Sequence, residues 1–272
     1  MYICIDFGGT KTAVAVFKED GTITYRNKIK TDHNYETHIK NLKTLIKHDL
    51  NEDIKIVCLS VPGLIDREEG VVKALGNLPW KNERIRDDLA QSFPGVEIVI
   101  ENDAKLGGLG EARAVIDQYT RVLYLTIGTG IGGALIVDGK ISKDLEDMEV
   151  GKMPLYYKND QLRHWEDMVS GRMIFEEHGK RAEEISDDSV WEEIGRKIGY
   201  GLGAVCSVLQ PEAIIFGGGV GQYSNKFSDA TARYLEENLH AIVNKPKAYL
   251  PPKYLEDSVL VGCYEYVKDY AG

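Results

Sequence analysis

The chain has few of the residues that mark specialised protein classes. Its 272 residues include only four cysteines, Cys4, Cys58, Cys206 and Cys263. They lie far apart in the sequence, and each falls within an apolar segment. This spacing argues against a disulfide framework and against a cysteine-based metal cluster, and it predicts buried, reduced thiols.

Basic residues are also in short supply, with 33 Lys and Arg against 43 Asp and Glu, for a formal net charge of −10. This balance argues against a nucleic-acid-binding surface, which needs a concentrated basic patch. No apolar run approaches the length of a membrane span. The chain opens directly on an apolar, strand-like run, Tyr2-Ile3-Cys4-Ile5, without a preceding signal segment. We therefore expect a cytoplasmic protein with no membrane or nucleic-acid partner.

Apolar patterning predicts strands that alternate with helices. A length of 272 residues is enough for one large domain or two modest ones, and a hydrophobic content of 43% is ordinary for a globular protein. Helical spacing occurs at 35–50, 82–91, 174–184, 189–209, 225–241 and 258–270, with cap candidates at Asn34 and Asp187. Strand-like runs between them, such as 54–61, 96–100, 122–128 and 213–216, predict an α/β architecture with at least part of the sheet parallel.

Two glycine loops in the chain resemble each other. The first is Asp6-Phe7-Gly8-Gly9-Thr10-Lys11-Thr12, and the second is Thr126-Ile127-Gly128-Thr129-Gly130-Ile131-Gly132-Gly133. Aligning Gly8 with Gly128 pairs Asp6 with Thr126 and Val14 with Ala134. Each copy is predicted to be a β-hairpin whose tight turn exposes backbone N–H groups, and such self-similarity indicates duplicated units. We expect the two loops to form a two-lobed phosphate clamp.

The first loop carries groups suited to a nucleotide's phosphates. Glycines allow close backbone approach, and hydroxyls and a lysine supply donors, so the candidates are Gly8, Gly9, Thr10, Lys11 and Thr12. Asp6 is a candidate for Mg²⁺, directly or through water, because Mg²⁺ prefers oxygen ligands and retains waters. The loop matches neither a Walker loop nor a Rossmann fingerprint. The alternative is a Gly-Gly hairpin turn made for geometry alone.

The second loop and a later glycine run are further nucleotide candidates. Gly128, Thr129 and Gly130 form a turn richer in glycine than a hairpin needs, and Thr129 can hydrogen-bond a phosphate oxygen. The run Gly217-Gly218-Gly219 follows a buried-looking strand and can admit a base or ribose. Its alternative interpretation is a plain strand-to-helix turn.

Asp103 follows a predicted strand, so it can either cap the segment beginning at Ala104 or act chemically. A phosphoryl acceptor hydroxyl benefits from a positioned carboxylate that accepts its proton. Asn102 beside it offers a donor and an acceptor to neighbouring hydroxyls.

Four further motifs accompany the two glycine loops: Val61-Pro62-Gly63-Leu64-Ile65-Asp66, Asn77-Leu78-Pro79-Trp80, Glu101-Asn102-Asp103-Ala104 and Ile215-Phe216-Gly217-Gly218-Gly219. Together these motifs resemble the ROK family of bacterial sugar kinases and related repressors. The resemblance implies the two-lobed actin/hexokinase/Hsp70 fold, which is ribonuclease H-like with duplicated β-hairpin phosphate loops. We expect an N-terminal lobe at 1–110, joined by a C-terminal helix at 257–272, and a larger lobe at 111–256.

The same resemblance implies ATP and Mg²⁺, with Asp103 as the base that activates a sugar's primary hydroxyl. Asn102 and Gly63 would contact the sugar, as would Glu149 and Glu166. In the family a Glu-x-Gly-His element contacts the sugar, whereas here the sequence is Glu149-Val150-Gly151-Lys152. Lys152 exchanges a ring that can donate or accept for an ammonium that only donates. No cysteine lies between Gly151 and Ser170, so the zinc motif of many members is missing and we expect no structural zinc.

The leading hypothesis is an ATP-dependent kinase for glucose or a close relative. Polyphosphate is an alternative donor, with Lys152, Lys158 and Arg163 as candidates for a polyanion path. A ROK repressor carries a helix-turn-helix segment ahead of its sugar domain, and a strand starting at Tyr2 leaves no room for one. A non-catalytic sugar- or nucleotide-binding protein is the remaining class. The resemblance also implies a homodimer.

Overall fold

The computed structural model describes residues 1–49, 54–75, 78–158 and 161–271 and divides into two compact units. Unit 1 comprises Met1–Gly110 and Val259–Gly272, and unit 2 comprises Glu111–Ser258. Two of the sequence features above, the end of the predicted helix at Leu50 and the start of the motif at Asn77, lie outside the described residues.

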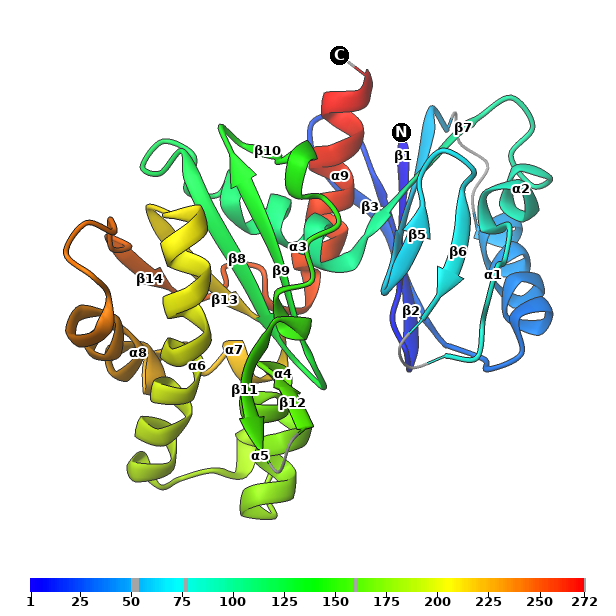
Figure 1. Cartoon of the computed structure of the whole chain (residues 1–272). Helices are drawn as coiled ribbons and strands as arrows, with labels where there is room; N and C mark the ends of the chain where they lie inside the picture. Colours follow the sequence, from blue (N-terminus) through cyan, green and yellow to red (C-terminus); the bar gives the residue numbers. More distant parts are fainter. Residues whose placement is uncertain (50–53, 76–77, 159–160, 272) are drawn as a thin grey trace. The chain divides into compact units, whose positions relative to one another are not determined.

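Unit 1 is built on a mixed sheet of five strands in the order β3-β2-β1-β4-β7 (Figure 1). The strands β1, β4 and β7 are parallel, whereas β2 and β3 add to the edge of β1 as an antiparallel meander. A small hairpin follows β4 and forms a separate two-stranded sheet. The bounds are β1 (Tyr2–Phe7), β2 (Lys11–Phe17), β3 (Ile23–Lys30), β4 (Ile56–Val61), β5 (Leu64–Asp66), β6 (Val71–Ala74) and β7 (Glu97–Asn102).

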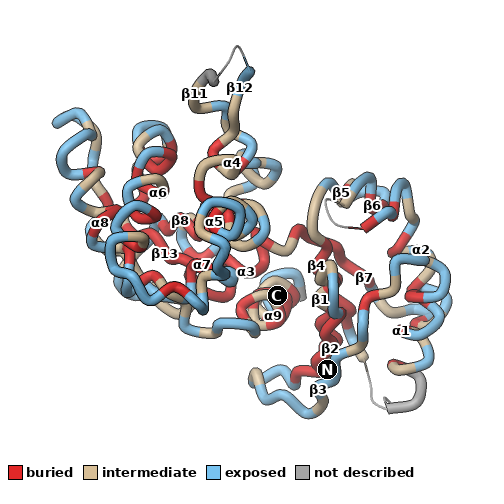
Figure 2. Tube along the Cα trace, turned by 90° about the horizontal axis from the view of Figure 1, so that it is seen from below, coloured by how far each residue is buried: buried red, intermediate tan, exposed pale blue. Residues whose placement is uncertain are grey.

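Helices cover both faces of this sheet. One face packs on α1 (Tyr35–Asp49) and α2 (Ile85–Ala90), and the other packs on α3 (Asp103–Arg113) and α9 (Ser258–Ala271). Side chains alternate across a strand, so Ile3 and Ile5 of β1 enter the first core while Cys4 enters the second. Figure 2 shows the central strands as buried. All four cysteines are free and buried, as the sequence predicted.

Unit 2 repeats this topology. Its five-stranded sheet has the order β10-β9-β8-β13-β14, in which β8, β13 and β14 are parallel and β9 and β10 form the antiparallel edge. The predicted duplication is therefore confirmed. The bounds are β8 (Arg121–Ile127), β9 (Ile131–Val137), β10 (Lys140–Ile141), β13 (Ala213–Gly217) and β14 (Ala248–Leu250).

The alignment of the two hairpins needs one correction. Phe7 pairs with Thr12 across the first loop, but Ile127 pairs with Ile131 across the second. The second loop is therefore one residue shorter, because four residues lie between the first pair and three between the second. Val14 consequently corresponds to Gly133, and the predicted match with Ala134 is wrong by one residue.

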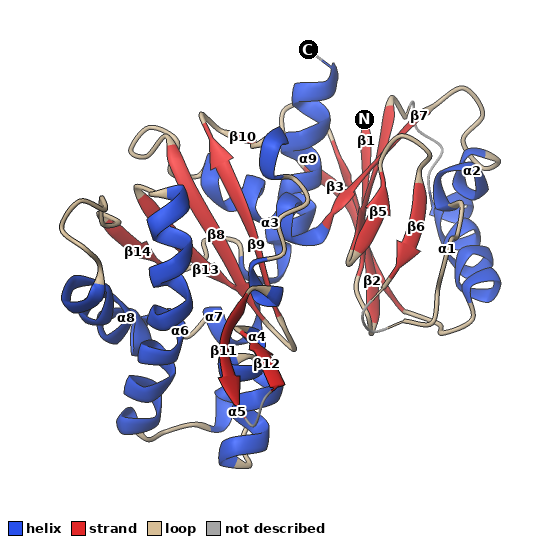
Figure 3. Ribbon diagram, in the orientation of Figure 1, coloured by secondary structure: helices blue, strands red, loops and turns tan. Residues whose placement is uncertain are grey.

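Two long helices, α6 (Asp188–Leu209) and α8 (Ser224–Asn238), pack on one face of the sheet of unit 2 (Figure 3). The shorter elements are β11 (Pro154–Lys158), β12 (Gln161–His164), α4 (Glu166–Val169), α5 (Gly171–His178) and α7 (Gly218–Gly221), with 3₁₀ turns η1 (Lys143–Leu145), η2 (Val150–Lys152), η3 (Ala182–Glu184) and η4 (Leu255–Asp257). None of the helices in the part of the chain that the structure describes is long and apolar enough to cross a membrane.

Both predicted helix caps are confirmed, whereas two of the predicted helices have other bounds in the structure. Asn34 accepts the Thr37 N–H at 2.9 Å and Asp187 accepts the Ser189 N–H at 2.9 Å, so both predicted caps are confirmed. The predicted helix at 174–184 is wrong in its second half. Gly179 adopts φ 64°, a left-handed conformation that ends α5, and 182–184 forms a separate 3₁₀ turn. The predicted helix at 82–91 forms only over α2.

Candidate functional site

The carboxyl ends of three parallel strands bring polar groups together in unit 1. Asp6 of β1 lies level with Ser60 of β4, which lies level with Glu101 of β7. One residue further on, Asn102 is level with Val61. Ligands of open α/β sheets bind outside the carboxyl ends of the strands, so this edge is the candidate site of unit 1.

Asp6 is held at this edge as a partly exposed carboxylate. Its Oδ1 accepts a hydrogen bond from Ser60 Oγ at 3.2 Å. Burial raises the pKa of Asp6 to about 7, and the negative charge of Asp103 adds to this shift. A carboxylate in such a place is stabilised in its charged form by a cation, so Asp6 suits the Mg²⁺ role predicted for it.

Asn102, and not Asp103, caps α3. The Asn102 side-chain oxygen accepts the N–H groups of Ala104 at 3.0 Å and Lys105 at 3.3 Å, and its amide nitrogen donates to the Gly63 carbonyl at 3.2 Å. The interpretation of Asp103 as the cap is therefore wrong. Because Asn102 is buried and its oxygen is used twice, it has only an amide hydrogen left to offer a ligand.

Asp103 is the first residue of α3, and its side chain remains partly exposed. Its Oδ1 accepts the Ala104 N–H at 2.8 Å, while Oδ2 has no hydrogen-bond partner among the residues that the structure describes. Burial raises the pKa of Asp103, whereas the Ala104 N–H and the Lys105 ammonium lower it. A carboxylate with one anchored oxygen and a raised pKa is well suited to accept a proton.

An ion pair that no sequence pattern predicted stabilises the end of β7. Arg67, in the β5–β6 turn, donates from Nε and Nη2 to the two oxygens of Glu101 at 2.9 and 2.7 Å. Glu101 also accepts the N–H of Asn102 at 2.6 Å. Its side chain is 2% exposed and that of Arg67 is 20% exposed. The pair ties the hairpin after Gly63 to the strand that carries Asn102, across 34 residues of sequence.

The first glycine loop presents most of its predicted residues to solvent. Gly8 N–H donates to the Lys11 carbonyl at 3.0 Å and closes the turn. Gly8 and Gly9 are partly exposed, and Thr10 and Lys11 are exposed. Thr12 differs, because it is fully buried and its hydroxyl contacts His38 and Thr31. Its side chain therefore supports the loop from the core of unit 1 and cannot contact a phosphate directly.

The second loop has the same construction in unit 2. Gly128 N–H donates to the Gly130 carbonyl at 2.9 Å, and Thr129 between them is exposed. The Gly128 carbonyl accepts the N–H of Gly171, the first residue of α5, at 2.7 Å. The sequence placed Gly128, Thr129 and Gly130 correctly in one turn, although it did not predict the contact with Gly171.

Two of the predicted sugar-binding residues meet beside this second loop. The Lys152 ammonium forms an ion pair with Glu166 Oε1, and Glu166 Oε2 accepts the Ile131 N–H at 3.4 Å. Lys152 is exposed, whereas the Glu166 side chain is 14% exposed. Glu149 is exposed and precedes η2, the turn that ends at Lys152. Lys152 thus pairs with a candidate ligand residue and is not merely a solvated surface lysine.

The three glycines after β13 differ in their surroundings. A Cβ on Gly217 would lie 2.1 Å from the Tyr124 hydroxyl, so this residue is packed against the sheet. Gly218 has φ +78° and lies against the Ile127 carbonyl. A Cβ on Gly219 would meet nothing within 4 Å, and the residue is exposed. Gly218 and Gly219 are accessible to a ligand, and Gly217 is a packing residue.

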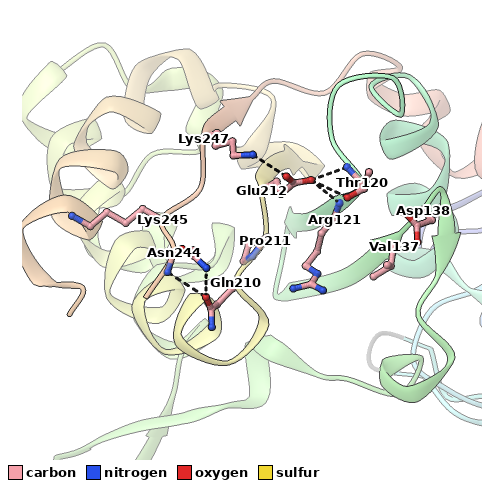
Figure 4. Close-up of a pocket in the computed structure, with 10 residues that line it drawn as sticks. All are labelled: Thr120, Arg121, Val137, Asp138, Gln210, Pro211, Glu212, Asn244, Lys245 and Lys247. Carbon is pink, nitrogen blue, oxygen red and sulfur yellow. Dashed lines mark hydrogen bonds and ion pairs between the residues drawn. The ribbon is translucent and has the colours of Figure 1, made fainter. Parts of the chain in front are cut away.

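A pocket of about 610 Å³ lies at the other end of the sheet of unit 2 (Figure 4). It includes Arg121 at the start of β8, whereas Gly128 follows the end of that strand. Glu212 in its wall accepts the Thr120 N–H at 2.8 Å and Lys247 Nζ at 2.9 Å. These contacts lower the pKa of Glu212 to about 2 and join the starts of three strands. The pocket is separate from the candidate site residues.

Among the described residues, one group of side chains has the spacing of a metal site, namely Glu177, His178 and Glu193. The Lys197 ammonium already bonds both carboxylates, at 2.6 Å to Glu177 and 2.8 Å to Glu193. These bonds place a positive charge where a cation would bind, so the group is a surface ion-pair network.

Comparison with known proteins identifies this arrangement. The model of the ROK family matches residues 2–270. The chain belongs to the ROK family. It is 28% identical to an N-acetyl-D-glucosamine kinase of Histophilus somni, over 90% of this chain and 92% of that protein. As a member of this group it is a sugar kinase, a phosphotransferase to a sugar hydroxyl.

Solved structures show the same fold. A ROK family glucokinase from Streptomyces griseus, in complex with glucose and AMPPNP, superimposes with a TM-score of 0.80 at 23% identity, covering 98% of this chain and 99% of that one. An inorganic polyphosphate/ATP-glucomannokinase from Arthrobacter sp. strain KM gives a TM-score of 0.72 at 23% identity, covering 99% and 98%. The predicted α/β fold of the ROK sugar kinases is confirmed.

Proposed function

We propose that this ROK sugar kinase transfers the γ-phosphoryl group of ATP to the primary hydroxyl of a hexose, with Asp103 as the base. The observation that carries this proposal is the state of Asp103. It is partly exposed at the carboxyl edge of a parallel sheet and is released from capping by Asn102. Its Oδ1 is anchored, and its Oδ2 has no hydrogen-bond partner within the described part of the chain. A carboxylate placed in this way can accept the hydroxyl proton as the phosphoryl group is transferred.

The two glycine loops are proposed to bind the phosphates. Each is a tight turn closed by an internal hydrogen bond, with an exposed threonine, Thr10 or Thr129, at or beside its tip. Backbone N–H groups in such turns form anion-binding concavities. Asp6 would hold Mg²⁺, directly or through water, and the bound ion would neutralise phosphate charge. Gly218 and Gly219 would lie against the nucleoside.

The sugar is proposed to contact Lys152, Glu149 and Glu166. Lys152 binds one oxygen of Glu166 and the Ile131 N–H binds the other, so the carboxylate is fixed in one orientation. Lys152 retains two further N–H donors for acceptor oxygens of a substrate. A hydroxyl oxygen or the acyl oxygen of an N-acetylhexosamine meets this requirement. We therefore propose glucose or a close relative, with N-acetylhexosamines as the alternative substrates.

Polyphosphate is the second candidate donor. The fold is shared with a polyphosphate- and ATP-using kinase, and exposed Lys11 lies in the first loop, where it can meet a polyanion. A non-catalytic sugar-binding protein is the alternative of another class, and the accessible Asp103 carboxylate argues against it.

The proposal is tested by assaying the purified protein with ATP and, in parallel, with polyphosphate over a panel of glucose, mannose, fructose and the N-acetylhexosamines. We expect Mg²⁺-dependent phosphorylation of at least one hexose with ATP, and loss of that activity when the metal is chelated. Activity with polyphosphate and none with ATP would show that polyphosphate is the donor. Saturable sugar binding without turnover for any combination would favour the non-catalytic class.

Replacing Lys152 with methionine is expected to raise the KM for the sugar about tenfold and to leave the KM for ATP unchanged. The change removes the charged hydrogen bond that orients Glu166, and such bonds contribute roughly 1.5–3 kcal/mol. Steady-state kinetics with each substrate varied in turn measures the effect. Lys247→Met is the matched control, because Lys247 also pairs with a glutamate on the surface of unit 2. An equal rise in both KM values would contradict a sugar-binding role.

A further inference from the structure

His38 is a titratable side chain buried completely inside unit 1. It lies on α1, its exposed fraction is 0%, and its ring packs against both Phe7 and Trp80, with ring centroids 5.7 and 5.3 Å away. Both ring nitrogens nevertheless have polar partners. Nε2 lies 2.9 Å from the Thr12 hydroxyl, and Nδ1 accepts the Asp32 N–H at 3.3 Å.

These contacts begin a chain of hydrogen bonds that ends on the first glycine loop. The Thr12 and Thr31 hydroxyl oxygens are 3.0 Å apart, and the Thr31 hydroxyl donates to the Gly8 carbonyl at 2.7 Å. Thr31 also donates its N–H to the Thr10 carbonyl at 3.0 Å. Thr31 therefore holds the loop at two carbonyl groups. Thr12 hydrogen-bonds the Thr31 hydroxyl, and His38 hydrogen-bonds Thr12.

The donor-to-acceptor order of these hydrogen bonds is fixed at both ends of the series. A carbonyl can only accept, so Thr31 donates to Gly8 and must accept from Thr12, and Thr12 must accept from His38. The Asp32 N–H can only donate, so Nδ1 carries no proton and Nε2 carries it. His38 is thus a neutral donor, and burial lowers its pKa in agreement with this state.

Holding the Gly8 carbonyl also orients the next N–H. In a trans peptide the carbonyl and the following N–H point in opposite directions. With the Gly8 carbonyl directed to Thr31, the Gly9 N–H points away from Thr31, and it has no partner among the described residues. The second loop shows the same device in unit 2. There the Gly128 carbonyl is held by the Gly171 N–H, which turns the Thr129 N–H the opposite way.

We propose that His38 is a positioning residue for the phosphoryl donor, acting through Thr12 and Thr31 to keep the Gly9 N–H directed at a phosphate. This inference rests on the proposed function, because it assumes that the first loop binds the donor. The two loops use different means. The second is held by the Gly171 backbone N–H, which only a proline at that position would remove. The first is held by side chains that can be replaced singly.

The test uses the whole protein with two paired substitutions. Thr31→Val keeps the side-chain volume and His38→Phe keeps a planar aromatic ring, and each removes one donor. Thr31→Ser and His38→Gln keep a donor in place. We expect the first two to raise the KM for ATP roughly three- to tenfold, the range of one hydrogen bond, with the KM for the sugar unchanged. Thr31→Ser and His38→Gln should keep the KM for ATP close to that of the wild type. The dissociation constants for ADP, measured by calorimetric titration in the absence of turnover, should rank the variants in the same order.

Thr231→Val separates positioning from simple destabilisation. Thr231 is a buried threonine of unit 2 whose hydroxyl bonds the Gly195 and Phe227 carbonyls at 2.9 and 3.2 Å. The Thr231→Val substitution should lower the free energy of unfolding and leave the KM for ATP unchanged. Folded Thr31→Val with the kinetics and ADP affinity of the wild type would overturn the inference alone. A folded wild-type protein that binds neither nucleotide nor polyphosphate would overturn the proposed function as well.

Discussion

Asp103→Asn is expected to lower kcat by about 10²–10⁴-fold while the KM values for sugar and ATP stay close to those of the wild type. Asparagine has nearly the same shape and can still accept the Ala104 N–H, which now binds Asp103 Oδ1 at 2.8 Å. It cannot take up a proton from the sugar hydroxyl. The loss should therefore fall on the chemical step, and steady-state kinetics with separate variation of each substrate measures it.

The variant should also fold normally. Burial raises the pKa of Asp103 in the folded protein, so its charged form costs stability. That cost is absent below the unfolded pKa and grows as pH rises toward the folded value. At neutral pH the neutral asparagine removes it, and the variant should unfold at a temperature no lower than that of the wild type. Asp20→Asn is the control, because Asp20 also accepts a backbone N–H, from Thr22 at 2.9 Å. Wild-type turnover in Asp103→Asn would exclude Asp103 as the base.

Arg67→Met is expected to destabilise the protein by about 3–5 kcal/mol, because it leaves the buried Glu101 carboxylate without its partner. The two side chains share two hydrogen bonds, and Glu101 is 2% exposed. Glu101 also holds the Asn102 N–H, so kcat should fall as the end of β7 loses its support. Urea unfolding gives the free-energy change.

The double variant Arg67→Met/Glu101→Gln sharpens this prediction. Glutamine carries no charge and can still accept the Asn102 N–H, so the double variant should be more stable than Arg67→Met alone. Arg84→Met is the surface control. Arg84 pairs with Asp87 at 2.6 Å with both side chains largely exposed, and its loss should change stability little. If Arg67→Met and Arg84→Met unfold at the same urea concentration, the buried pair does not stabilise the site.

Features governed by local pattern were predictable from the sequence. The repeated hairpins follow from strand patterning around glycines, and the caps at Asn34 and Asp187 follow from side chains that bond their own helix. The sequence places Asp6 and Ser60 each near the end of a predicted strand, but it does not predict that they lie level with each other. That register depends on parallel pairing between strands separated by about fifty residues of sequence.

Features that depend on tertiary contacts were not predictable. Asn102 became the cap in place of Asp103 because β7 continues two polar residues beyond Ile100. Thr12 has a sequence position typical of a phosphate ligand, yet its alternating place in β2 turns it into the core against His38. The pairing of Arg67 with Glu101 has no sequence signal, because each looks like an ordinary surface charge.

The central claim is the transfer of a phosphoryl group to a sugar's primary hydroxyl with Asp103 as the base. The most direct measurement is the identification by nuclear magnetic resonance of the product formed from ATP, Mg²⁺ and the preferred hexose of the panel. We expect one hexose phosphate, esterified at the primary hydroxyl, for each ADP released, and at most trace product with Asp103→Asn. A phosphate on another hydroxyl, or ADP release without any sugar phosphate, would contradict the account.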